Sequence, residues 1–152
     1  TAGFEIDMRY KINKISGFGN FSYAHRLDET IKDTSIIEHP DEITWASAIN
    51  ANLGLNYTHS KFYLSLWAHL QGPVNRRDSD IDELNSNFRP DQIDMWVNLN
   101  TKVAYRITSK SEIGVLVQNL LDQDQYLVKN NLYAFDYKRH GIRAMVDFTV
   151  RF

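Results

Sequence analysis

Alternation of apolar and polar residues is the feature of this sequence that most constrains its fold. From Phe4 to Ile12 every second residue is apolar, and the residues between them are Glu5, Asp7, Arg9 and Lys11. A helix would mix these two sets on every face, whereas a strand places them on opposite faces. The segment is therefore predicted to be a β-strand with one apolar and one charged face.

Six further segments repeat this pattern, and no segment has a convincing helical period. The seven predicted strands cover residues 4–12, 17–25, 45–57, 62–71, 93–106, 111–119 and 142–152. In the fifth strand, Ile93, Met95, Val97 and Leu99 are expected on one face, opposite Asp94 and Asn98. The sequence thus predicts an all-β, antiparallel fold.

The connections between these strands alternate in length. Short turns are predicted at residues 13–16, 58–61 and 107–110, and long polar connections at 26–44, 72–92 and 120–138. Outer-membrane barrels have short periplasmic turns and long extracellular loops, whereas loops near this length are uncommon in an ordinary soluble domain. The alternation favours an up-and-down transmembrane β-barrel.

Aromatic residues support the membrane interpretation. One aromatic side chain lies on the apolar face of each of five strands, near the short-turn end: Tyr10, Tyr57, Phe62, Tyr105 and Phe152. Aromatic rings concentrate at the headgroup level of a bilayer. The mean hydropathy of −0.43 does not oppose this interpretation, because a barrel strand is apolar on only one face.

Composition excludes several classes of protein. The net charge of −2 provides no basic excess for nucleic acid, so we expect no nucleic-acid partner. Cysteine is absent, which removes disulfides and cysteine-rich zinc sites, and the five histidines lack metal-ligand spacing. No glycine-flanked serine, metal triad or phosphate-binding glycine loop occurs. We therefore expect no enzyme activity, no cofactor and no metal site.

Several short motifs occur in order along the last third of the chain, namely Asn119-Leu120-Leu121-Asp122, Tyr126, Gly141, Arg143 and Val150-Arg151-Phe152. Earlier segments give similar support, namely Leu53–Tyr57, and Ile93–Met95 leading to Tyr105 and Arg106. Together these segments, from about Trp45 onward, resemble the TonB-dependent receptors, large outer-membrane barrels that import siderophores, haem, cobalamin and similar scarce ligands. In that family a glycine usually joins arginine directly, whereas Ile142 separates them here.

The resemblance implies that residues 1–152 are the C-terminal segment of a barrel of about 22 strands, without its plug domain. The odd strand count agrees with a fragment, because single-chain bacterial barrels have even numbers of strands. The implied location is the bacterial outer membrane. The implied partners are membrane lipid, TonB through an N-terminal region absent here, and an iron chelate or other small ligand.

The last predicted strand suggests a further partner. Phe148, Val150 and Phe152 alternate along it and resemble the signal read by the barrel-assembly machinery, which would pair with the strand's free edge. Ligand contacts are expected in the long connections. Arginine is suited to bidentate binding of an anionic ligand, and the candidates there are Arg26, Arg76, Arg77 and His39.

Three functions remain open from the sequence. The leading hypothesis is energised uptake of a scarce ligand such as a ferric siderophore. A passive porin or small structural outer-membrane barrel is the first alternative. A soluble β-domain that binds a partner is the second.

Overall fold

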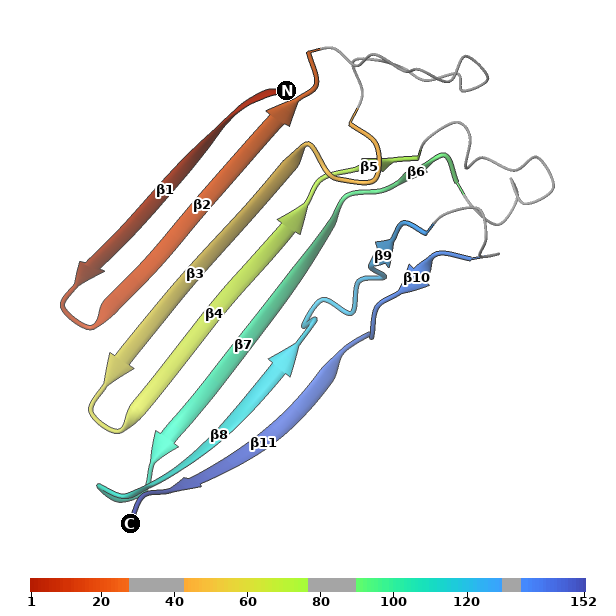
Figure 1. Cartoon of the computed structure of the whole chain (residues 1–152). Coiled ribbons are helices and arrows are strands. Elements are labelled where there is room, and N and C mark those ends of the chain that lie inside the picture. Colours follow the sequence, from red (N-terminus) through yellow and green to blue (C-terminus); the bar gives the residue numbers. More distant parts are fainter. Residues whose placement is uncertain (28–42, 77–89, 130–134) are drawn as a thin grey trace.

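In the computed structural model, which describes residues 1–27, 43–76, 90–129 and 135–152, the chain forms one large antiparallel sheet (Figure 1). None of the described residues forms a helix long and apolar enough to cross a membrane. Seven strands lie side by side in the order β1-β2-β3-β4-β7-β8-β11. Their bounds are Ala2–Ile12 (β1), Ile15–His25 (β2), Ile49–His59 (β3), Phe62–Gln71 (β4), Trp96–Arg106 (β7), Ser111–Gln118 (β8) and Arg143–Val150 (β11).

The seven predicted strands are confirmed, but some of their bounds were wrong. β3 begins at Ile49 instead of Trp45, because Trp45 has a positive φ of 68° that a strand cannot accommodate. The strand predicted at 93–106 is broken at Asp94 and Met95, so that Trp96 starts a separate strand. β11 is shorter than predicted and omits Ile142 and the last two residues.

Two small sheets within the predicted long connections were not foreseen. β5 (Val74–Asn75) pairs with β6 (Gln92–Ile93), and β9 (Tyr126–Leu127) pairs with β10 (Tyr137–Lys138). All the long connections leave the large sheet at one end, and the short turns close the other end (Figure 1). This arrangement confirms the predicted alternation of connection lengths.

The two faces of the sheet differ in chemistry. On the polar face, Asn52 donates its backbone and side-chain N–H groups to the Asn20 side chain and lies 2.8 Å from His69 Nδ1. Lower on the same face, Lys102 Nζ lies 3.2 Å from Asp147 Oδ1 across Gly114. Charged and amide groups of this face therefore interact across strands, as expected for such pairs.

No described segment of the chain covers the apolar face of the same sheet. Leu53 is 63% exposed and Val146 is 72% exposed, although both lie within long strands. The predicted aromatic residues lie at the short-turn end, where Phe62 is paired with Tyr105. The few buried apolar residues of the described chain lie elsewhere, and most of them lie near the long connections: Val74, Ile93, Trp96 and Ala104.

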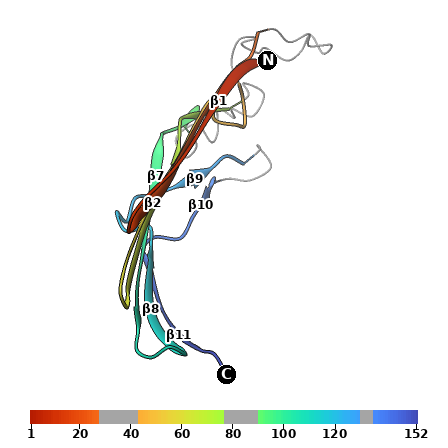
Figure 2. The same cartoon turned by 90° about the vertical axis from the view of Figure 1, so that its left-hand side faces the viewer.

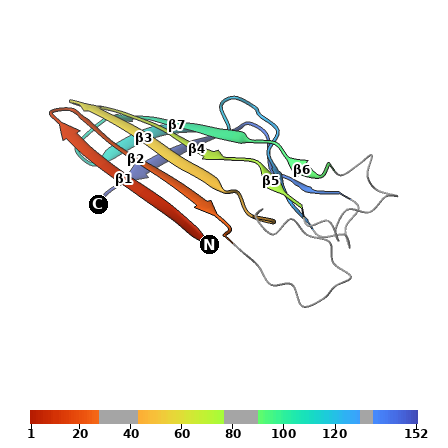
Figure 3. The same cartoon turned by 90° about the horizontal axis from the view of Figure 1, so that it is seen from above.

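The sheet is curved (Figures 2 and 3), and one part of the chain leaves it on one side (Figure 2). Hydrogen bonds to Trp96 and Asn100 place this part against the polar face. This part, which we call the arm, comprises residues 119–129 and 135–142 and contains β9 and β10. The arm touches the polar face through Asn100, whose Oδ1 accepts a hydrogen bond from the Asn119 amide at 3.2 Å. A soluble sheet would cover its apolar face instead, so the covering here is the inverse of that in a soluble domain.

Candidate functional site

The arm begins in a tight turn built on Asn119 and Asp122. Both residues have positive φ, 51° and 48°, a conformation that asparagine and aspartate tolerate better than most residues. The Asp122 amide donates to the Asn119 carbonyl at 2.9 Å and closes the turn. Leu120 and Leu121 lie between them and are 41% and 57% exposed.

The Asn119 side chain is the hub of this turn, and it is only 3% exposed. Its Oδ1 accepts hydrogen bonds from the Gln123 amide and from Gln125 Nε2, both at 3.2 Å, and its Nδ2 donates to the Gln123 carbonyl at 3.0 Å. Gln125 is almost completely buried beside it. A single asparagine therefore holds the first residues of the arm in place.

Asp122 joins the two ends of the arm. Its Oδ1 accepts a hydrogen bond from the Ile142 amide at 2.8 Å, and a Cβ at Gly141 would lie only 2.8 Å from the same oxygen. The next residue, Arg143, donates to Gln118 Oε1 at 3.0 Å. The structure thus brings Asn119, Asp122 and Gly141 together, and they act as the foundation of the arm.

Trp96 anchors the middle of the arm to the sheet. Its indole N–H donates to the Tyr126 carbonyl at 3.3 Å, and the Arg139 guanidinium lies 5.4 Å from its ring centroid. The His69 ring contacts Trp96 edge-on at 5.4 Å. Because Trp96 is only 2% exposed, these contacts form a closed packing unit between β4, β7 and the arm.

Arg76 connects the arm to the neighbouring connection that carries β5 and β6. Its guanidinium donates to the Pro90 carbonyl at 2.7 Å, to the Lys129 carbonyl at 3.0 Å and to the Asp136 carboxylate. The other oxygen of Asp136 accepts a hydrogen bond from the backbone N–H of Lys129 at 3.1 Å. The Arg76 side chain is 1% exposed, so it holds two connections together and does not face solvent.

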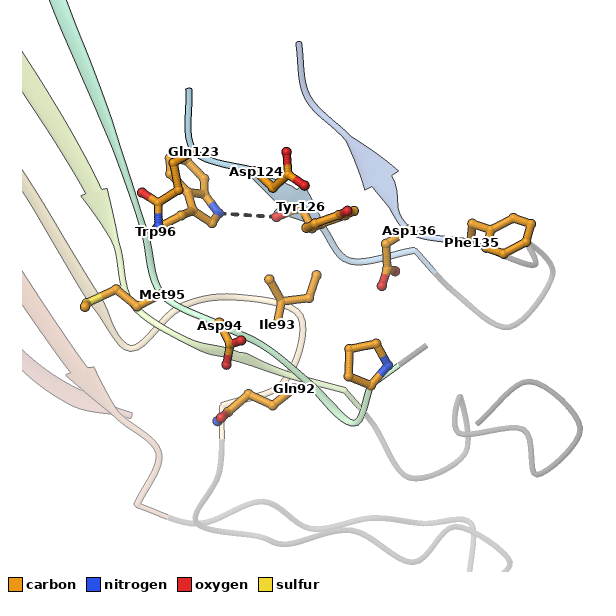
Figure 4. A pocket seen from close by; sticks show the side chains of 11 residues that line it. Gln92, Ile93, Asp94, Met95, Trp96, Gln123, Asp124, Tyr126, Phe135 and Asp136 are labelled. Carbon is orange, nitrogen blue, oxygen red and sulfur yellow. Dashed lines mark hydrogen bonds between the residues drawn. The ribbon is translucent and has the colours of Figure 1, made fainter. Parts of the chain in front are cut away.

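A cavity of about 710 Å³ lies between β6 and β9 (Figure 4). Ile93 and Asp94 form one wall, and Asp124 and Tyr126 form the opposite wall. Met95, Trp96 and Gln123 close one end, while Asp136 and Phe135 lie at the other. Its size is in the range of small-molecule sites.

The predicted ligand contacts are distributed as follows. Arg26 lies at the end of β2, with its Nη2 3.5 Å from the Thr44 hydroxyl. Arg76 is buried in the ion pair with Asp136. Arg77 and His39 lie outside the described residues.

Other predicted residues occupy different places. Tyr126 lines the cavity and lies below the Lys138 ammonium, 5.8 Å from its ring centroid. The hydrogen bond that Lys138 donates to Asp124 raises the pKa of its ammonium group. Phe148 and Val150 project from β11, an outer strand of the sheet, and Phe152 follows it and is fully exposed.

Apart from Tyr126, which belongs to the family resemblance, sequence reasoning did not identify the two acidic residues contributed to the cavity by the arm, Asp124 and Asp136. Asp136 occurs in a polar stretch without any period, and its partner Arg76 is 60 residues away in the chain. Asp94 was predicted to lie on the polar face of a continuous strand. The one available signal was Trp96, a large ring at a position where the alternation predicts a polar residue.

Solved structures of other proteins contain a similar fold. No protein-family model and no curated protein matches the sequence. The ferric-catecholate import receptor Fiu from E. coli K12 matches 96% of the chain with a TM-score of 0.75 at 15% identity. The ferric enterobactin receptor PfeA from Pseudomonas aeruginosa matches 99% with a TM-score of 0.70 at 14% identity.

The copper transporter OprC matches 99% of the chain with a TM-score of 0.64 at 17% identity. The chain spans only about a fifth of the length of these structures, 20%, 22% and 23% respectively. At this level of identity the comparisons concern the fold. The open seven-stranded sheet is therefore part of an antiparallel β-barrel of the kind found in these receptors, which confirms, for the fold, the resemblance to TonB-dependent receptors.

Proposed function

We propose that this chain is part of an outer-membrane receptor that imports a scarce ligand, such as a ferric siderophore, with energy supplied through TonB. The observation that carries the proposal is the inverted sheet, whose polar face is covered by the arm while its apolar face is bare. Similarity of fold to two ferric-chelate receptors and a copper transporter supports the same conclusion.

The proposed location is the bacterial outer membrane, with lipid against the apolar face. Five of the strands have 10 or 11 residues, which agrees with the 9–11 residues that a tilted strand needs to cross a bilayer. In this arrangement the long connections and the arm lie at the extracellular end. The short turns, together with the aromatic residues beside them, lie at the periplasmic boundary.

The proposal assigns residues 1–152 to the C-terminal segment of a barrel of about 22 strands. The plug domain and the TonB-contacting region would come from other parts of the polypeptide. Ligand uptake therefore belongs to the complete receptor, to which this chain would contribute wall strands and extracellular connections.

We further propose that β11 is the strand recognised by the barrel-assembly machinery. Its apolar side chains alternate and are exposed, with Phe148 at 62% and Val150 at 45%. A strand with one unpaired edge can add to the sheet of a partner. Phe152→Ala should slow insertion of the protein into the membrane in cells. Arg151→Ala, on the opposite face of the strand, should leave the rate of insertion unchanged.

Uptake is tested by deleting the gene and measuring growth under iron limitation with a panel of ferric siderophores. The proposal expects slower growth on at least one of them, and expects no rescue by the intact gene in a host that lacks TonB. Diffusion of small solutes through the purified protein in liposomes, without TonB, would instead identify a passive porin. A protein that remains monodisperse in buffer without detergent would contradict both membrane functions.

A further inference from the structure

The cavity between β6 and β9 has a distinctive charge. Three of its lining residues carry carboxylates, namely Asp94, Asp124 and Asp136. No described lining residue is lysine, arginine or histidine. The remaining walls combine apolar, aromatic and amide side chains, of which Met95 is 54% exposed and Tyr126 is 37% exposed. An anionic group entering this cavity would find no basic side chain among the described lining residues.

The three carboxylates are not equivalent. Asp136 is neutralised from behind by the buried Arg76 guanidinium. Asp124 is paired with Lys138, whose Nζ lies 2.6 Å from Asp124 Oδ2. Asp94 is exposed and has no ion-pair partner among the residues that the structure describes. The cavity therefore retains one uncompensated carboxylate in the wall opposite Tyr126 (Figure 4).

Lys138 shows how a cation is held at this place. Its ammonium is hydrogen-bonded to the Asp124 carboxylate and at the same time lies 5.8 Å from the Tyr126 ring centroid. A cation within about 6 Å of a ring centroid is attracted by the negative face of the ring. One edge of the cavity thus already contains a carboxylate, a ring and a cation, and the cation comes from the chain itself.

We propose that this cavity binds a positively charged organic group, such as an ammonium, attached to an aromatic or apolar frame. The cation would face Asp94, and the frame would lie against Met95 and the Tyr126 ring. A metal ion is a weaker candidate, because the described residues contain no group of three or more His, Asp or Glu side chains placed to hold one.

The inference goes beyond the proposed function, because it concerns binding in one cavity and does not require transport. It also distinguishes this site from one built for an anionic chelate, which arginine side chains would bind. The field of a carboxylate in a partly enclosed cleft concentrates cations and excludes anions, and salt weakens that effect.

The test uses the protein purified in a non-ionic detergent, with benzyltrimethylammonium as the probe and benzenesulfonate as its anionic counterpart. Both have one aromatic ring and one charge, and the two charges are opposite in sign. Calorimetric titration is expected to detect the ammonium probe and not the sulfonate. Raising the salt concentration should weaken binding of the ammonium probe.

Asp94→Asn is expected to weaken binding at least about fivefold, as the loss of one charge-assisted contact implies. Asp91→Asn is the matched control, because Asp91 belongs to the same connection, does not line the cavity, and uses only its backbone carbonyl to bind the Arg76 amide. The control should bind the probe like the parent protein.

Three results would overturn the inference: equal affinity for the two probes, no effect of Asp94→Asn, or the same loss in Asp91→Asn. Asp94→Lys provides a second readout if the asparagine variant is poorly folded, since it should abolish binding of the ammonium probe while unfolding remains cooperative. The proposed function is judged separately, because uptake without TonB dependence would reject it while leaving probe binding unchanged.

Discussion

Arg76 and Asp136 are 60 residues apart in the sequence and form a buried ion pair that joins two neighbouring connections at the outer end of the sheet. Backbone groups satisfy the remaining hydrogen bonds of the pair. Arg76 also donates to the Pro90 and Lys129 carbonyls, and Asp136 also accepts from the Lys129 backbone N–H. Buried ion pairs are costly to desolvate, so this one fixes the geometry of the cavity more than it stabilises the fold.

Removing only one partner of the Arg76–Asp136 pair should therefore lower the free energy of unfolding more than removing both. Arg76→Met leaves the buried Asp136 carboxylate without its ion-pair partner and should lower the free energy of unfolding by about 3 kcal/mol, whereas Arg76→Met with Asp136→Leu should recover much of that loss. Denaturant unfolding in detergent measures both. Hydrogen exchange at the Lys129 amide reports on the arm itself, and equal losses in the single and double variants would contradict a buried pair.

Asn119 is expected to be the most sensitive residue of the arm. Asn119→Ala removes the side chain that satisfies Gln123 and Gln125 and also places alanine at a positive φ, so unfolding should become easier by about 2–4 kcal/mol. Asn119→Gly removes the same hydrogen bonds without the backbone penalty. The glycine variant should therefore be more stable than the alanine variant by about 1 kcal/mol in the same denaturant titration.

Gly54 and Gly19 form a matched pair that tests side-chain packing on the large sheet. A Cβ at Gly54 would lie 2.1 Å from the Phe18 ring, whereas a Cβ at Gly19 would meet its nearest atom, in Leu53, at 3.5 Å. Gly54→Ala should force the ring out of its rotamer and cost about 1 kcal/mol. Gly19→Ala should be neutral or slightly stabilising. Thermal unfolding measures the melting temperature of each variant. Equal shifts in the two melting temperatures would show that the Phe18 ring is not held over Gly54.

The parts of the fold that sequence could predict are those with a repeating pattern. Alternation located all seven long strands, most clearly in β1 and least clearly in β2, where only Phe21 and Tyr23 mark the apolar face. It failed at Asp94 and Met95, since Ile93, Met95 and Val97 continue the apolar set even though the backbone leaves the sheet there. A break of two residues leaves no trace in a period of two.

The candidate site could not be predicted for a related reason. β5, β6, β9 and β10 contain two residues each, too few for any periodic signal. The burial of Arg76 could not be predicted, because burial of a residue in a connection depends on partners such as Asp136 that only the folded chain brings near. Asn119 and Asp122 were recognised through the family resemblance, but their role in closing the turn depends on backbone angles that the sequence does not display.

The orientation of the sheet in the membrane gives the last prediction, through two adjacent residues of β11. Val146 lies on the apolar face and Met145 on the polar face with Asp147, and both side chains are exposed in the chain alone. With lipid against the apolar face, Val146→Arg should cost about 2–4 kcal/mol in a bilayer, whereas Met145→Arg should cost much less. Unfolding of the complete receptor from lipid vesicles measures the difference. A loss from Met145→Arg as large as that from Val146→Arg would contradict an arrangement in which lipid contacts the apolar face and the polar face lines the lumen.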